Sequence, residues 1–157
     1  MAQVFISFVH EEENFAKAVQ QFLKDKLDNQ SVFMSADKWQ VIAGEIWLDR
    51  IQQELDSAKV VILMLSQKSV GRPWVNFEAG AAWLTGKVII PACFCELTKG
   101  NLPKPYSNIQ ALDLPNDIYY LVRSVAHYLG FPIAPPPIVL GSPELKQLED
   151  AIAHVNA

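Results

Sequence analysis

The chain has 157 residues, of which 50% are apolar, 10% are aromatic and 19% are charged, and its formal net charge is −4 at pH 7. A disordered chain would carry fewer apolar residues, so this composition excludes disorder and predicts one folded domain with its own core. The small acidic excess leaves no surplus of cations for phosphate groups, so we expect no direct contact with nucleic acid.

The pattern of the sequence leads us to expect neither a signal peptide nor a membrane span. The N-terminus has no basic segment and turns acidic at Glu11, unlike a secretory signal. The longest apolar run covers residues 60–65, which is too short to cross a bilayer. We therefore expect a soluble cytoplasmic protein with no membrane partner.

Cysteine and histidine form no pattern that indicates a disulfide framework or a metal site. Cys93 and Cys95 are two residues apart, so a strand holding both would point the thiols to one face as small apolar side chains. The three histidines are not spaced as metal ligands are; they are His10, His127 and His154. We expect no metal, and we expect His127 and His154 to be ordinary residues of helix surfaces.

Short apolar runs alternate with segments in which apolar residues recur every three or four positions, as in amphipathic helices. In chain order, the pattern predicts a strand over residues 3–8, a helix over 12–27, a strand over 31–34, a loop over 35–44, a helix over 45–57, a strand over 59–65, a helix over 69–85, a strand over 87–93, a short strand over 110–112 and a helix over 116–129.

This alternation is typical of βαβ units, so we expect an α/β fold, a flavodoxin-like, doubly wound parallel sheet of five strands with helices on both faces. Pro91 lacks a backbone donor, which predicts that its strand ends nearby or lies at an edge. Ligands of such sheets bind beyond the carboxyl ends of the strands. The candidate site residues are therefore 7–10, 35–39 and those from Ser66 onward.

The tail departs from the alternation. Residues 131–142 are proline-rich and should be extended, and residues 143–154 have the periodicity of one more helix. We assign residues 1–130 to one domain and residues 131–157 to a linker with a C-terminal helix. That helix either packs back on the domain or leads into a second domain beyond this chain.

The common nucleotide-binding and nucleophile motifs do not occur. No G-x-G-x-x-G follows the first strand, and there is no G-x-S-x-G elbow. Residues 80–87 resemble a phosphate loop only loosely, because five residues separate the glycines and Val88 stands where serine or threonine would hold magnesium.

The segment RPWVNFEAGAAW, residues 72–83, is the most informative in the chain. Trp74, Glu78 and Ala82 are spaced four apart and share one helix stripe. Phe77, Ala81 and Leu84 make a neighbouring stripe that can face the sheet. On spacing alone, Glu78 is expected to be a solvated glutamate beside a half-buried tryptophan.

An ordered set of segments resembles the Toll/interleukin-receptor (TIR) domain family, and its bacterial branch most of all. The segments are VFISF, SVFMSADKW, AGEIW, KVVILMLS and RPWVNFEAGAAW, and together they span about residues 3–130. Trp74-x-x-x-Glu78 resembles the W-x-x-x-E pattern that the family carries on the helix after its third strand.

The resemblance implies cleavage of NAD⁺ at the nicotinamide–ribose bond, which yields nicotinamide and ADP-ribose or a cyclic ADP-ribose isomer. It implies that Glu78 is the catalytic residue and that NAD⁺ is a substrate, with no further cofactor. Nicotinamide leaves as a neutral molecule, so one carboxylate that stabilises positive charge on the ribose is enough, whereas ordinary glycosidases need two.

The other candidate residues are expected to bind substrate around Glu78. Trp74 and Phe8 would shape the pocket, and Ser7 and His10 would line its edge after the first strand. The same resemblance places residues 36–44, with Lys38 and Trp39, at the substrate cleft and the subunit contacts, where either residue would meet the phosphates or the adenine.

The resemblance has two departures. Acidic residues 11–13 follow the first strand, where many members have Ser or Lys and then Asp. Residues 42–44 read Ile-Ala-Gly in place of the Arg-Pro-Gly or Pro-Gly of many receptor loops, which weakens the receptor-adaptor interpretation most.

Three functions remain open. The first is an NAD⁺ glycohydrolase, an effector of bacterial anti-phage defence that is activated by assembly with other TIR domains and linked to a sensor domain or protein. The second is a non-catalytic TIR–TIR interaction module that docks through residues 36–44. The third is a flavodoxin-like response or nucleotide domain, which would need an acidic pair where Ser7-Phe8-Val9 stands.

Overall fold

The computed structural model describes residues 3–27, 32–36, 52–131 and 143–156. Five parallel strands form one sheet in the order β2-β1-β3-β4-β5. The strands are β1 (Val4–Phe8), β2 (Val32–Ala36), β3 (Val60–Leu65), β4 (Val88–Cys93) and β5 (Leu112–Asp113). The prediction of a doubly wound parallel sheet is thus confirmed.

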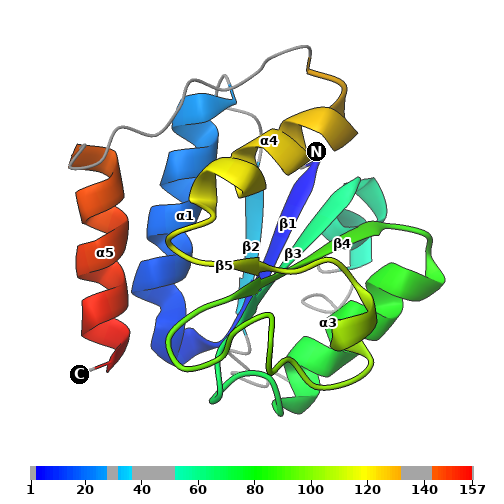
Figure 1. Ribbon diagram of the computed structural model, residues 1–157. Helices are drawn as coiled ribbons and strands as arrows, with labels where there is room; N and C mark the ends of the chain where they lie inside the picture. The colour runs from blue at the N-terminus through cyan, green and yellow to red at the C-terminus, as the bar shows by residue number, and fades with distance from the viewer. Residues whose placement is uncertain (1–2, 28–31, 37–51, 132–142, 157) are drawn as a thin grey trace, which may run out of the picture.

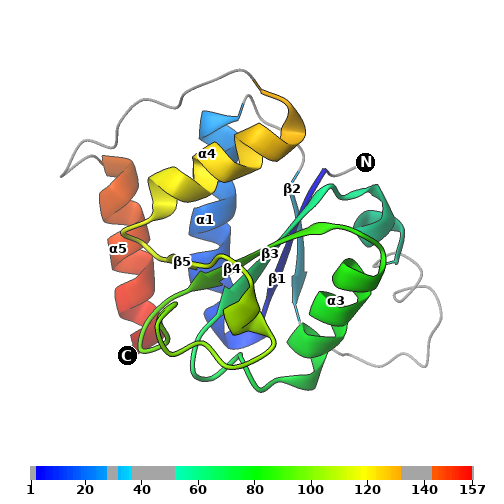
Figure 2. The same ribbon diagram turned by 45° about the vertical axis from the view of Figure 1, so that its right-hand side comes forward.

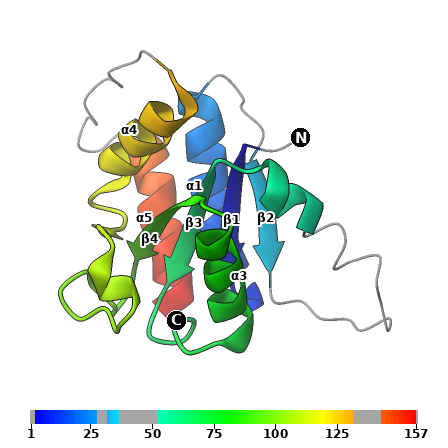
Figure 3. The ribbon, with the colours of Figure 1, turned by 90° about the vertical axis from the view of Figure 1, so that its right-hand side faces the viewer.

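Helices cover both faces of this sheet. They are α1 (Glu13–Lys26), α3 (Pro73–Leu84), α4 (Ile118–Leu129) and α5 (Pro143–Asn156), with short 3-10 turns η1 (His10–Glu12) and η2 (Tyr106–Asn108). Residues 52–57 are also helical, and the rest of the predicted helix over 45–57 lies outside the described residues. Figure 3 shows α3 in front of the sheet and α1 and α5 behind it.

Alternate side chains of β1 enter two separate cores. Val4, Ile6 and Phe8 belong to the core beneath α1 and α4. Phe5 and Val9 belong to the core beneath α3. Because side chains alternate along a strand, Ser7 lies on the α3 side of the sheet.

Helix α3 begins later than predicted and turns a different face to the sheet. Residues 66–69 form a turn closed by reciprocal hydrogen bonds between Ser66 and Ser69, so the helix starts only at Pro73. The stripe that could face the sheet is instead turned outward, with Phe77 56% exposed and Leu84 88% exposed. Spacing gives the stripes of a helix but not which one is packed.

The buried side of α3 is the stripe of Trp74, Glu78 and Ala82 together with its neighbours Val75 and Ala79. These alanines let the helix approach the sheet closely, and the polar member of the stripe finds a partner on β1.

Strand β4 tolerates its proline because it is only partly paired. Pro91 lies opposite Leu63 of β3, whereas β5 pairs only with Ala92 and Cys93. Within the described residues, one side of β4 therefore has no strand partner at Pro91, as the sequence predicted.

The two cysteines do not share a face, because the strand that would have to hold both does not reach Cys95. β4 ends at Cys93, which is buried in the core beneath α3. Cys95 lies beyond the strand at φ 58° and packs against the other core. The strand alternation that the prediction assumed stops before Cys95, and both thiols are free.

Helix α5 packs against α1, and the two lie side by side in Figures 1 and 2. Leu145 and Leu148 of α5 are buried and join the core beneath α1 and α4. Among the described residues, no helix has both the length and the apolar character needed to cross a bilayer.

Candidate functional site

Helix α3 carries Glu78 into the protein interior. The helix begins at Pro73, which suits a first turn because its missing N–H would have no helical partner there. Trp74 precedes Glu78 by one turn and Ala82 follows it by one turn, so all three share the buried side. Glu78 has no solvent-exposed surface, so the sequence expectation of a solvated glutamate was wrong.

Ser7 holds the Glu78 carboxyl group. Its hydroxyl donates a hydrogen bond of 2.6 Å to Glu78 Oε1 across the interface between β1 and α3. Ser7 itself is fully buried. A buried carboxyl group is costly unless hydrogen bonds compensate for lost water, and Ser7 supplies one such bond.

Trp74 lies at the edge of the same interface. It is 8% exposed and stacks on Phe77 with ring centroids 5.5 Å apart and an interplanar angle of 20°. Because Phe77 is 56% exposed, this stacked pair reaches from the Glu78 stripe to the outer surface of α3.

An ion pair ties the start of α3 to the turn after β1. The Arg72 guanidinium lies 2.7 Å from a carboxylate oxygen of Glu11, and Arg72 is the residue that precedes helix α3. Asn76 donates to the backbone carbonyl of Arg72 at 3.1 Å and so braces the same end of the helix. These contacts fix the first turn of α3 and therefore the position of Trp74.

Glu12 is a second buried carboxyl group, which the sequence reasoning did not single out. It is 2% exposed at the end of η1, and its Oε1 atom has no hydrogen-bond partner within the described residues. Burial raises its pKa above the ordinary value, against an opposing effect of a hydrogen bond from Ser66. The acidic run 11–13 alone could not show which glutamate points inward.

The remaining candidates are not gathered around Glu78. Phe8 is buried on the opposite face of the sheet, in the core beneath α1 and α4. His10 is exposed in η1, with Nδ1 3.7 Å from a carboxylate oxygen of Glu13. Lys38 and Trp39 lie outside the described residues. The structure thus brings Ser7, Glu78 and Trp74 together, and it does not place Phe8 or His10 with them.

Within the described ranges, no cluster of three or more histidine, cysteine, aspartate or glutamate side chains could hold a metal ion. The chemistry available at this site is that of a carboxyl group steadied by a hydroxyl and flanked by an indole. Such a group can stabilise a developing positive charge or hold sugar hydroxyls. Because Glu78 is closed to solvent, a substrate can reach it only if the residues that cover it rearrange.

Comparison with known proteins identifies the fold. One solved structure with the same fold is a metazoan TIR-STING receptor from C. gigas in complex with 2',3'-cGAMP, with 18% sequence identity and a TM-score of 0.54. The match covers 87% of this chain and 41% of that chain, so this chain spans less than half the length of the receptor.

A second match is to the TIR domains of the activated Roq1 resistosome that recognises the pathogen effector XopQ. It has 8% identity and a TM-score of 0.48, and it covers 99% of this chain and 84% of that chain. No curated protein matches the sequence.

A family model described as TIR domain matches residues 4–122, which is most of the chain and includes β1, α3 and the Ser7–Glu78 pair. The chain therefore belongs to the TIR domain family.

Proposed function

We propose that this TIR domain is an NAD⁺ glycohydrolase with Glu78 as its catalytic residue. The observation that carries the proposal is the fully buried Glu78 carboxyl group, which Ser7 binds at 2.6 Å one helical turn after Trp74. A residue of a passive helix surface would have no reason to place a carboxyl group between a helix and a sheet, where desolvation is costly.

The proposed reaction breaks the bond between the nicotinamide nitrogen and C1′ of the ribose. The bonding electron pair leaves with nicotinamide, which neutralises the pyridinium nitrogen, and positive charge develops on the ribose. The Glu78 carboxylate stabilises this charge. Water then forms a bond to C1′ and loses a proton to give ADP-ribose, whereas attack by a group of the same nucleotide gives a cyclic isomer.

Activation by assembly follows from the closed state of the site. Glu78 has no exposed surface, so we expect the isolated chain to cleave NAD⁺ slowly until contacts with other copies open the cleft. The outward stripe of Phe77, Ala81 and Leu84, which we call the α3 outer stripe, offers an apolar surface for such contacts. Trp74 joins the two regions through its stacking on Phe77.

The same α3 outer stripe supports a second candidate function, that of a non-catalytic TIR–TIR interaction module. Phe77 and Leu84 are 56% and 88% exposed, which is a cost in solubility unless a partner covers them. An interaction module leaves the burial of Glu78 unexplained, so we rank it second.

The roles of a cytoplasmic anti-phage effector and of a sensor partner rest on the resemblance to bacterial TIR domains.

The test is release of nicotinamide from NAD⁺ by the purified chain over a series of protein concentrations, with and without polyethylene glycol as a crowding agent. Glu78→Gln keeps the size of the side chain and removes its charge. Glu149→Gln, at an exposed position of α5, is the matched control. We expect release that rises more steeply than protein concentration, is lost in Glu78→Gln and is unchanged in Glu149→Gln.

Equal release by wild type and Glu78→Gln would show that Glu78 is structural. A chain that self-associates under crowding yet releases no nicotinamide would overturn the enzyme proposal and favour the interaction module.

A further inference from the structure

A cavity of about 540 Å³ lies on the side of α3 that faces η2, apart from the Glu78 carboxyl group. Helix α3 contributes Asn76, Ala79, Gly80 and Trp83, β4 contributes Ile89, and the other lining residues lie in the range 105–109. Its volume is within the range of pockets that hold small molecules, about 300–1,000 Å³.

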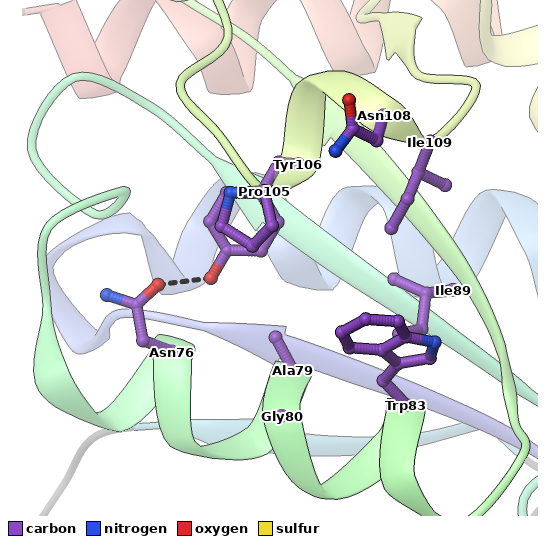
Figure 4. A pocket seen from close by; sticks show the side chains of 9 residues that line it. All are labelled: Asn76, Ala79, Gly80, Trp83, Ile89, Pro105, Tyr106, Asn108 and Ile109. Carbon is purple, nitrogen blue, oxygen red and sulfur yellow. Dashed lines mark hydrogen bonds between the residues drawn. The ribbon is translucent and has the colours of Figure 1, made fainter.

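The walls of this cavity suit a planar ring. Figure 4 shows the indole of Trp83 and the side chains of Ile89 and Ile109 on one side of the open space, with the ring of Tyr106 on the other. Trp83 is 71% exposed, so a large part of its indole surface is available to a ligand. Aromatic walls stack on flat rings and bury large apolar area at low entropic cost.

The Tyr106 wall is held in place before any ligand arrives. Its hydroxyl donates a hydrogen bond to Asn76 Oδ1, and the Asn76 side-chain nitrogen donates to the Arg72 carbonyl at 3.1 Å. Tyr106 is 6% exposed, and burial raises the pKa of its phenol, which therefore stays neutral near pH 7. A preformed wall lowers the cost of binding because fewer groups must be ordered.

Among the described residues, the lining has no charged side chain, so these residues offer nothing to neutralise a charged ligand. Asn108 also lines the cavity and is exposed, so its carboxamide is accessible to a ligand. That carboxamide can both donate and accept, which matches an amide or hydroxyl group on the ligand. The electrostatics thus select a neutral ring with one polar group.

Gly80 leaves the floor of the cavity open. An added Cβ at Gly80 would meet no atom within 4 Å, so neither a neighbouring side chain nor the backbone requires a glycine there. A glycine within a helix costs about 1 kcal/mol relative to alanine. The helix thus gives up stability at a position that lines the space a ligand would fill.

We propose that this cavity is a binding site for a neutral, planar aromatic molecule that carries an amide or hydroxyl group. The ring lies between Trp83 and Tyr106, and its polar group pairs with the carboxamide of Asn108. The proposal does not depend on the NAD⁺ reaction, because none of the lining residues belongs to the Ser7–Glu78 pair.

Three probes of similar size test the proposal by titration of the full chain, followed through the backbone amide shifts in NMR. Benzamide is planar and neutral, benzoate is planar and charged, and cyclohexanecarboxamide is neutral but not planar. We expect benzamide to bind with a dissociation constant in the millimolar range and to shift the amides of Gly80, Ile89 and Ile109. Benzoate and cyclohexanecarboxamide should bind at least about tenfold more weakly, a difference of about 1.4 kcal/mol.

Variants locate the site and separate it from the active-site proposal. Gly80→Leu fills the cavity and Trp83→Ala removes one wall. Each should weaken the binding of benzamide at least about tenfold, or about 1.4 kcal/mol. Gly80→Ala shows whether replacement of the glycine alone disturbs the fold. Glu78→Gln should leave benzamide binding unchanged, whatever it does to NAD⁺ turnover.

Shifts that cluster at Ser7 and Val9, equal binding of the three probes, or benzamide binding that survives Gly80→Leu would each overturn the proposal. So would the absence of any shift at millimolar benzamide. Dimers that are lost in Gly80→Leu would show that a second copy of the chain occupies the groove instead, which also overturns it.

Discussion

The hydroxyl of Ser7 donates a 2.6 Å hydrogen bond to Glu78, a residue 71 positions further along the chain, and neither residue has any solvent-exposed surface. This bond joins the interior strand β1 to α3 through a carboxyl group that water cannot reach. The loss of one partner would leave the other buried with one hydrogen bond fewer, which is costlier than the loss of a surface bond. The pair therefore links the stability of the sheet–helix interface to the orientation of the proposed catalytic group.

We expect Ser7→Ala to lower the free energy of unfolding by about 1–3 kcal/mol, because it removes a buried donor to a carboxyl group. Urea denaturation measures the loss. Ser124→Ala is a matched control, because the Ser124 hydroxyl donates to the Tyr120 carbonyl in an exposed hydrogen bond within α4. A Ser7→Ala protein as stable as Ser124→Ala would show that the bond contributes nothing to the fold.

The sequence alone was sufficient to predict the sheet and much of its topology. Residues 60–65 form a continuous apolar run because β3 is central and covered on both faces, and alternation with helical periodicity indicates parallel strands. The edge strand β5 was predicted over residues 110–112, whereas it covers Leu112–Asp113 in the structure. The prediction missed its bounds because two paired residues leave little pattern to detect.

The orientation of α3 could not be predicted in the same way. Its two stripes, one with Trp74 and Glu78 and one with Phe77 and Leu84, have similar apolar content, and the second lacks a charge. Periodicity therefore favoured the stripe that is exposed. What decides the packing is the Ser7 hydroxyl on a distant strand, together with alanines that allow close approach, and neither is visible within the helix.

Glu12 is expected to make stability depend on pH. Burial raises its pKa, so the folded protein binds the proton more tightly than the unfolded chain does. The contribution of this group to stability is greatest below the ordinary glutamate pKa of about 4.3 and is lost as the pH rises through the raised value. Glu12→Gln cannot ionise, so its free energy of unfolding should exceed that of wild type by a margin that grows across this range.

Urea denaturation at a series of acidic to neutral pH values checks the Glu12 prediction. Glu149→Gln, an exposed position on α5, is the control and should follow wild type at every pH. A constant difference between Glu12→Gln and wild type would mean that ionisation of Glu12 is not responsible.

The α3 outer stripe should affect assembly rather than folding. Leu84 is 88% exposed, so Leu84→Lys is expected to change the free energy of unfolding by less than about 0.5 kcal/mol. The same substitution should weaken self-association in sedimentation velocity and lower nicotinamide release under crowding, because it places a charge on the apolar stripe. Tyr120→Lys, at a 54% exposed position on α4, is the control for added charge. Unchanged sedimentation of Leu84→Lys would place the contact surface elsewhere.

The two free thiols should react at very different rates in the folded protein. Cys93 is fully buried, and burial raises its pKa to about 11, so at pH 8 only about one molecule in a thousand carries the reactive thiolate there. The pKa of Cys95 is also raised by burial, but Cys95 is only half-buried and more accessible to a reagent. We expect iodoacetamide at pH 8 to modify Cys95 alone in the native chain and both cysteines in denaturant, as read by mass spectrometry. Cys95→Ser should abolish the native reaction and Cys93→Ser should preserve it, whereas rapid native labelling of Cys93 would show that the core beneath α3 opens readily.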